Sequence, residues 1–70
     1  MTTVYHIIAE EKEWEVVNEG EDRVISHHKS KREALRRARK LAKEKERETV
    51  EVIVHRPDGE VERRYSFGSR

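Results

Sequence analysis

The sequence predicts an α+β fold, a two-layer sandwich in the order β-β-β-α-β-β, with a single helix packed on one face of a mainly antiparallel sheet. Two observations lead to this prediction. Over residues 30–47, Ala and Leu recur at the spacing of an amphipathic helix. On either side lie five short segments rich in β-branched residues, three before the helix and two after it. At 70 residues, the chain is expected to form one domain with a small core.

The helix is expected over residues 30–47. Ser30, followed three residues later by Glu33, has the form of a capping box, in which each side chain can accept from the other residue's free backbone N–H. The expected apolar stripe consists of Ala34, Leu35, Ala38, Leu41 and Ala42. Most other positions are Lys, Arg or Glu, so the outer face of this helix should be charged.

The strands are expected at residues 2–9, 13–18, 22–28, 49–56 and 60–67. Short polar segments separate the first three strands. Between the last two, Pro57, Asp58 and Gly59 form a strong turn signal, because Pro fixes φ and Gly accepts a positive φ.

One helix cannot cover both faces of a five-stranded sheet. Alternation along the strands predicts a helix side formed by Val4, Ile8, Trp14, Val16, Val24, Val52 and Val54. The open sheet face is then expected to carry Tyr5, Ile7, Val17, Ile25 and Ile53. Such a face is either a half-solvated surface held by cross-strand pairs or a self-association surface with twofold symmetry. The small core favours the second interpretation, a homodimer.

Composition excludes several classes of protein. Charged residues make up 44% of the chain, yet the net charge is only +1, a balance typical of a folded domain rather than a disordered one. The absence of cysteine excludes disulfides, thiolate nucleophiles and thiolate metal sites. Abundant Glu, Lys and Arg with a single Met is typical of a thermostable protein or an engineered sequence.

The expected location is cytoplasmic. Apolar runs are only a few residues long, and no charged-then-apolar leader is visible. The apolar stripe of the helix is rich in Ala and lacks Trp and Phe, so it suits packing on a sheet better than insertion into a membrane surface.

The positive charge is concentrated in the helix. Residues 30–47 carry nine basic residues against three acidic ones, whereas residues 1–29 carry seven acidic residues against three basic ones. The candidate phosphate-binding residues on the outer helix face are Arg32, Arg36, Arg39, Lys40 and Lys43. The last expected strand carries a basic and aromatic segment, Arg63, Arg64, Tyr65 and Phe67, that could stack bases. Non-specific nucleic-acid binding is therefore an alternative function. The acidic first strands count against it, because they would repel phosphate.

No pattern indicates catalysis, and we expect no enzyme, cofactor or metal. The serines have no nucleophile-elbow context, and the three glycines form no phosphate-cradling loop. His27 and His28 are neighbours on a strand and should point to opposite faces, while His6 and His55 lie on separate strands. Neither pair has the spacing of a metal site.

Several short motifs together resemble a family of small bacterial and archaeal domains of unknown function. The motifs run over nearly the whole chain: Trp14-x-Val16, Glu19-Gly20, Ala34-x-x-x-Ala38, Val54-His55-x-x-Asp58-Gly59-x-Val61 and Ser66-Phe67-Gly68. The last motif has Phe67 where Tyr is commoner in that family. The resemblance implies the same small α+β fold and no established activity.

The sequence thus predicts a small non-enzymatic module that associates with itself or binds a protein partner through the open sheet face. Two alternatives stay open. One is non-specific nucleic-acid binding by the helix, and the other is a designed or stabilised scaffold without activity.

Overall fold

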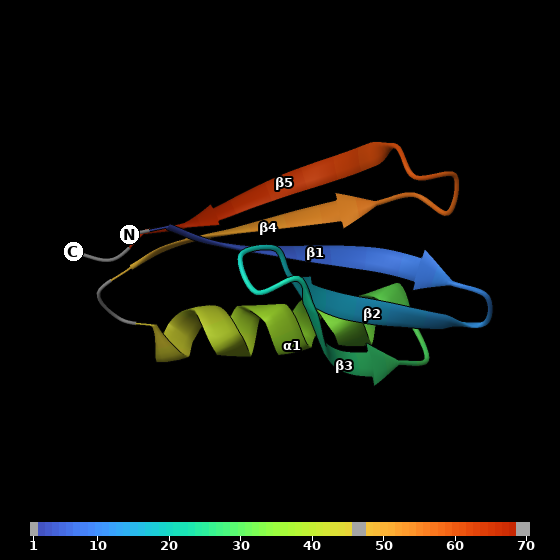
Figure 1. The fold of residues 1–70 in the computed structure, drawn as a ribbon, viewed down its shortest axis with the longest axis horizontal. Helices are drawn as coiled ribbons and strands as arrows, with labels where there is room; N and C mark the ends of the chain where they lie inside the picture. The colour runs from blue at the N-terminus through green and yellow to red at the C-terminus, as the bar shows by residue number, and fades with distance from the viewer. Residues whose placement is uncertain (1, 46–47, 69–70) are drawn as a thin grey trace.

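The chain forms six elements: β1 (Thr2–Glu10), β2 (Glu13–Asn18), β3 (Arg23–His28), α1 (Lys31–Glu44), β4 (Thr49–His55) and β5 (Val61–Phe67) (Figure 1). The structure, a computed structural model, describes residues 2–45 and 48–68. Its single sheet has the strand order β3-β2-β1-β4-β5. The central β1 and β4 are parallel and the other three pairs are antiparallel. The α+β fold class and the element order predicted from the sequence are therefore confirmed.

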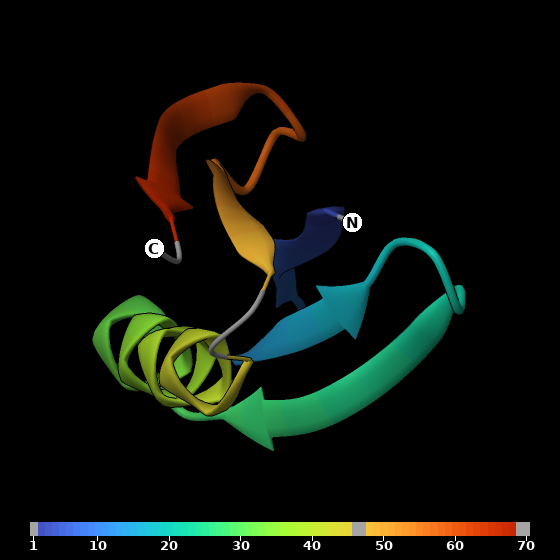
Figure 2. The same cartoon turned by 90° about the vertical axis from the view of Figure 1, so that its left-hand side faces the viewer.

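The helix is the crossover between two parallel strands. β3 lies at one edge of the sheet, and α1 carries the chain past β2 and β1 to reach β4. Parallel strands need such a long connection because a tight turn can join only antiparallel neighbours. Seen end-on in Figure 2, the sheet curls from β3 to β5 and α1 lies on its concave side. The opposite, convex side is the face that α1 leaves uncovered.

The ends of α1 follow the capping signals. The backbone N–H of Glu33 donates to Ser30 Oγ at 3.1 Å. At the other end, the N–H of Lys45 donates to the carbonyl of Ala42 at 3.2 Å. The helix was expected to extend to residue 47, whereas α1 ends at Glu44, and residues 46–47 lie outside the described part of the chain.

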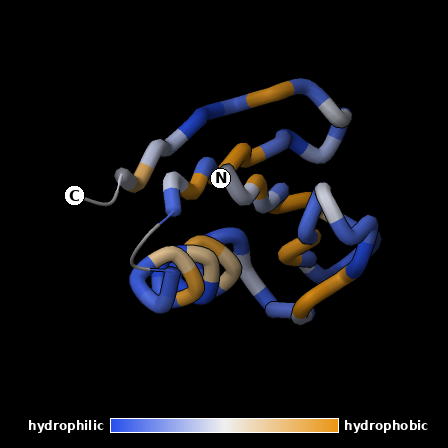
Figure 3. Tube along the Cα trace, turned by 60° about the vertical axis from the view of Figure 1, so that its left-hand side comes forward, coloured by the Kyte–Doolittle hydropathy of each residue, from blue (hydrophilic) through white to orange (hydrophobic). Residues whose placement is uncertain are grey.

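The core lies between α1 and the concave face of the sheet. Ala34, Ala38 and Ala42 are the buried residues of α1, and their small side chains let the helix backbone approach the strands closely. The buried core cluster consists of these alanines with Tyr5, Ile7, Val16, Val50, Val52 and Val54. Figure 3 shows the alternation of hydrophobic and hydrophilic positions along the strands. Burial raises the pKa of the Tyr5 hydroxyl above its usual value, because an apolar setting disfavours the phenolate.

The β4–β5 turn is built by its own polar groups. Gly59 has φ +96°, a conformation that strains any residue with a Cβ. The N–H of Gly59 donates to the carbonyl of Arg56 at 2.8 Å, and the N–H of Glu60 donates to Asp58 Oδ1 at 2.9 Å. The His55 ring also contacts this turn, with Nδ1 3.1 Å from the carbonyl of Gly59. The His-x-x-Asp-Gly motif is therefore a hairpin signal with a clear structural reason.

Candidate functional site

Two of the five residues predicted for the open sheet face lie there. Val17 and Ile53 flank His6 of β1, one on β2 and the other on β4, and neither belongs to the core cluster. Ile53 is only 7% exposed although no helix covers it, because neighbouring strands surround it at the centre of the sheet.

The placement of Tyr5 and Ile7 on the open face was wrong. Tyr5 is 3% exposed and Ile7 is fully buried, and both pack in the core beneath α1. Consequently Val4 and Ile8, expected on the helix side, lie on the open face by strand alternation. The error arose because β1 carries apolar residues at both odd and even positions. Its alternation therefore does not say which set faces the helix.

The placement of Ile25 on the open face was also wrong, for a different reason. Val16 pairs with Ser26 but Val17 pairs with Val24, so the register shifts by one residue at Ile25. This β-bulge interrupts the alternation and lets Ile25 pack against the core. The same shift brings Val24 onto the open face beside Val17, where it is 41% exposed.

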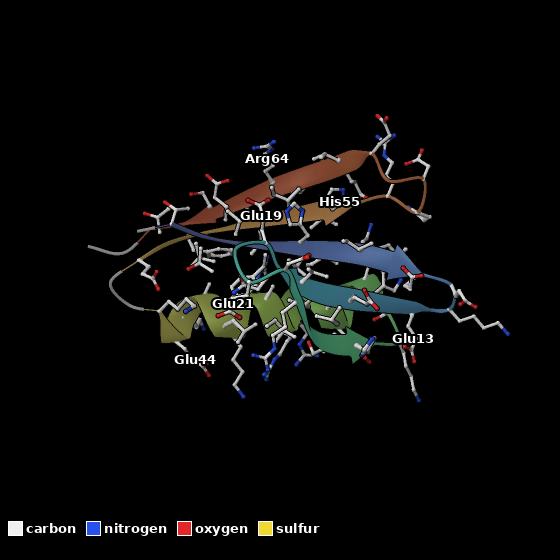
Figure 4. All side chains as sticks on the ribbon, in the orientation of Figure 1. Glu13, Glu19, Glu21, Glu44, His55 and Arg64 are labelled. Atoms are coloured by element: carbon white, nitrogen blue, oxygen red, sulfur yellow. The ribbon has the colours of Figure 1, made fainter. Side chains whose placement is uncertain are left out.

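The open sheet face is therefore defined by six apolar residues: Val4, Ile8, Val17, Val24, Ile53 and Val61. They surround His6 on β1. Its charged positions include Glu15 on β2, Glu51 on β4 and Arg64 on β5. In Figure 4, Arg64 projects from β5 while Glu19 and His55 lie over the central strands.

A chain of side-chain contacts crosses the middle of this face. Glu19 Oε1, in the β2–β3 turn, lies 2.6 Å from His6 Nε2. His6 Nδ1 lies 2.8 Å from His55 Nε2, a hydrogen-bond distance, and the centres of the two rings are 5.0 Å apart. The opposite nitrogen of His55 meets the carbonyl of Gly59. Sequence reasoning missed this cluster because only the parallel β1–β4 register brings the two histidines together.

The other two histidines point to opposite faces, as expected for strand neighbours. His27 Nε2 lies 3.1 Å from Glu15 Oε2, and His28 Nε2 lies 2.8 Å from Ser26 Oγ. Within residues 2–45 and 48–68, no group of three or more His, Cys, Asp or Glu side chains has an arrangement suited to a metal ion. Nor is any helix in these ranges long and apolar enough to cross a membrane.

The predicted phosphate-binding residues form an exposed stripe on α1. Each of the five, Arg32, Arg36, Arg39, Lys40 and Lys43, is exposed. The ion pairs found among the described residues include none of them. The Arg39 guanidinium lies 5.7 Å from the centre of the Tyr65 ring, with Arg63 at 5.9 Å from the same ring. The stripe therefore continues onto β5.

A shallow groove of about 270 Å³ separates the start of α1 from β5. Leu35, Val54 and Tyr65 contribute its apolar lining, and Arg32 and Arg63 contribute charge. At the same place Lys31 Nζ donates to both carboxylate oxygens of Glu62, at 2.9 and 2.8 Å. This hydrogen bonding lowers the pKa of Glu62 below its usual value.

Comparison with known proteins identifies relatives without a known activity. A family model described as "Uncharacterized protein conserved in bacteria (DUF2188)" matches residues 5–67. The "Uncharacterized protein YdaT" of Bacillus subtilis (strain 168) is 41% identical over 69 residues, which cover 99% of this chain and 44% of that protein. The chain thus spans less than half the length of this relative. No solved structure matches the chain.

Proposed function

The chain belongs to the uncharacterised bacterial family DUF2188, and we propose that it is a non-enzymatic association module whose open sheet face binds a second copy of the same chain. The observation that carries the proposal is the set of six apolar residues on the sheet face opposite α1. Val24 and Val61, on the two edge strands of this face, are 41% and 45% exposed.

The centre of the open sheet face would meet its own copy in a symmetric dimer. A twofold axis parallel to β1 would place β4 of one copy over β2 of the other. Because Val17 and Ile53 are both level with His6, each would meet the other across the axis. On the next level, Glu15 of one copy would approach His55 of the other. Apolar groups would thus meet at the centre, with Glu15 of each copy beside His55 of the other.

The variant that tests this proposal is Ile8→Lys. Ile8 is half-buried at the centre of the face, so a lysine there can reach solvent in the monomer but not in the dimer. We expect the parent chain to sediment as a dimer at micromolar concentrations and Ile8→Lys as a folded monomer. Ile53 is a poorer choice because its side chain is already buried within one copy.

The matched control for this test is Lys40→Glu, a charge change on the outer face of α1. It should leave the dimer intact. A parent chain that stays monomeric at these concentrations, or a folded Ile8→Lys variant that still dimerises, contradicts the proposal. Circular dichroism checks the fold of each variant.

A second candidate function, non-specific nucleic-acid binding, uses the opposite side of the molecule. Its support is the exposed stripe of five basic residues on α1 and its continuation to Arg63 and Tyr65. The stripe has no Asn or Gln that could read adenine edges, so phosphate contacts would dominate and salt would weaken binding strongly.

The test of this second candidate is a mobility shift with mixed DNA and RNA at low and physiological salt. We expect a shift at low salt that Arg36→Glu with Lys40→Glu abolishes, while Lys12→Glu in the β1–β2 turn causes only a slight loss. If low salt produces no shift, or if the double variant still binds, the stripe is not a nucleic-acid site. Failure of both this test and the sedimentation test would leave the scaffold without activity as the remaining interpretation.

A further inference from the structure

The side-chain contacts across the open sheet face form one continuous row of hydrogen bonds. They join four groups in a row: the Glu19 carboxylate, the His6 ring, the His55 ring and the carbonyl of Gly59. The groups come from the β2–β3 turn, β1, β4 and the β4–β5 turn. A single row of hydrogen bonds therefore links two turns that are far apart in the sequence.

This row needs one more proton than two neutral histidines carry. The Gly59 carbonyl can only accept, so His55 Nδ1 must hold a hydrogen. An ionised Glu19 also only accepts, so His6 Nε2 must hold another. A third hydrogen must lie between His55 Nε2 and His6 Nδ1. Two neutral imidazoles supply two hydrogens, and the third is an extra proton.

We propose that Glu19, His6 and His55 hold this one proton between them and form a proton-dependent clamp that ties the β2–β3 turn to the β4–β5 turn across the open sheet face. Loss of the proton removes one of the three hydrogen bonds. Gain of a second proton puts a hydrogen on both facing nitrogens and breaks the bond between the rings. The clamp is complete in one protonation state only.

The charged groups around the clamp lie on the open side of the sheet and in the two turns, and those in the β2–β3 turn besides Glu19 are Glu21 and Asp22. Glu15 on β2 and Glu51 on β4 lie diagonally from His6, and Arg64 on β5 lies beyond Ile53. In the β4–β5 turn, the nearby charged groups are Arg56, Asp58 and Glu60. α1 lies on the opposite face of the sheet, so its charges do not face the clamp. His6 itself is only 20% exposed, which limits access of water to the central bond.

The clamp predicts the sign of the pH dependence on both sides of neutrality. Below about pH 6.5, where free histidine protonates, the unfolded chain binds two protons on these rings and the clamp holds one. Stability then rises with pH, because the unfolded state binds more protons. Above that pH the unfolded chain binds none while the clamp keeps its proton, so stability falls as pH rises. The clamp contributes most near the middle of this range.

The experiment compares the unfolding constant of the parent chain with that of His6→Gln from pH 5 to pH 8.5. Urea unfolding is followed by the fluorescence of Trp14, the single tryptophan, at a concentration low enough to keep the chain monomeric. We expect the difference between the two proteins to be bell-shaped, with the ratio of constants changing by up to about tenfold per pH unit on each side. A difference that is flat or changes in one direction only overturns the proposal.

Two further variants make the test specific. Glu19→Gln replaces an acceptor by an amide that can donate to His6 Nε2, so two neutral histidines can complete the row. In this variant the decline on the alkaline side should disappear. His27→Gln is the control, because it removes a separate pair with Glu15 that has no second imidazole, and its difference from the parent should not be bell-shaped. Persistence of the alkaline decline in Glu19→Gln contradicts the shared proton.

The consequence for association rests on the proposed function. A second proton would place two positive rings in the centre of the open sheet face, so the dimer should weaken between pH 7 and pH 5 in the parent chain and less so in His6→Gln. Sedimentation at both pH values measures this. A chain that is monomeric throughout refutes the proposed dimer but not the clamp, because the unfolding profile is measured on the monomer.

Discussion

Replacement of Ile7 by alanine is expected to lower the free energy of unfolding by about 2–5 kcal/mol. Ile7, on β1, is fully buried in the core between the sheet and α1. The truncated side chain would leave a cavity there, because the closely packed sheet cannot move to close it. Ile8→Ala, at the next position of the same strand, is expected to cost about 1 kcal/mol or less, because Ile8 is half-buried on the open sheet face. The two variants delete the same atoms from opposite sides of β1.

Urea unfolding of both variants, followed by circular dichroism and by Trp14 fluorescence, measures this difference. The free energy of unfolding of a domain of this size is only a few kcal/mol, so Ile7→Ala could unfold it. Ile7→Val, with an expected cost of about 0.5–1.5 kcal/mol, is a milder version of the test. Equal losses for the two alanine variants, or a larger loss for Ile8, would mean that β1 faces the other way. Low protein concentration separates this effect from any loss of dimer.

Replacement of Ala38 by leucine is expected to cost about 1–3 kcal/mol. Ala38 is fully buried at the middle of α1, where only a methyl group separates the helix from the sheet. A leucine there must push α1 away from the strands or adopt a strained rotamer. The loss should appear as a lower urea midpoint.

The matched control is Lys40→Leu, which introduces the same side chain two residues along on the exposed face of α1. Both variants have similar helix propensity, so the control isolates the packing effect. We expect its stability to stay within about 0.5 kcal/mol of the parent chain. If Ala38→Leu is as stable as the control, the close approach of helix and sheet is not a feature of the folded protein.

The order and type of the elements could be predicted from the sequence because their signals are local. The Ser30 cap and the Ala-rich stripe defined α1. The turn around Gly59 separated the last two strands. Each of these features depends on residues within a few positions of one another, so no knowledge of the tertiary contacts was needed.

The composition of the candidate site could be predicted only in part. Val17 and Ile53 were placed correctly because their neighbours in the sequence are clear core residues. Val16 on β2, and Val52 and Val54 on β4, face the helix, so Val17 and Ile53 must face the other way. The exposed basic stripe on α1 was also expected, since helical periodicity separates it from the alanines. Tyr5, Ile7 and Ile25 were misplaced, and the clamp was missed.

These failures have a common physical reason, which is that each depends on contacts between distant parts of the chain. β1 is apolar on both faces, so only its pairing with β4 and the position of α1 decided that Ile7 is inside. A bulge opposite β2 turned Ile25 inward, and a parallel register placed His6 beside His55. The sequence by itself determined where helix and strands form. The tertiary structure decided which face of each strand is buried, because strand register is a long-range property.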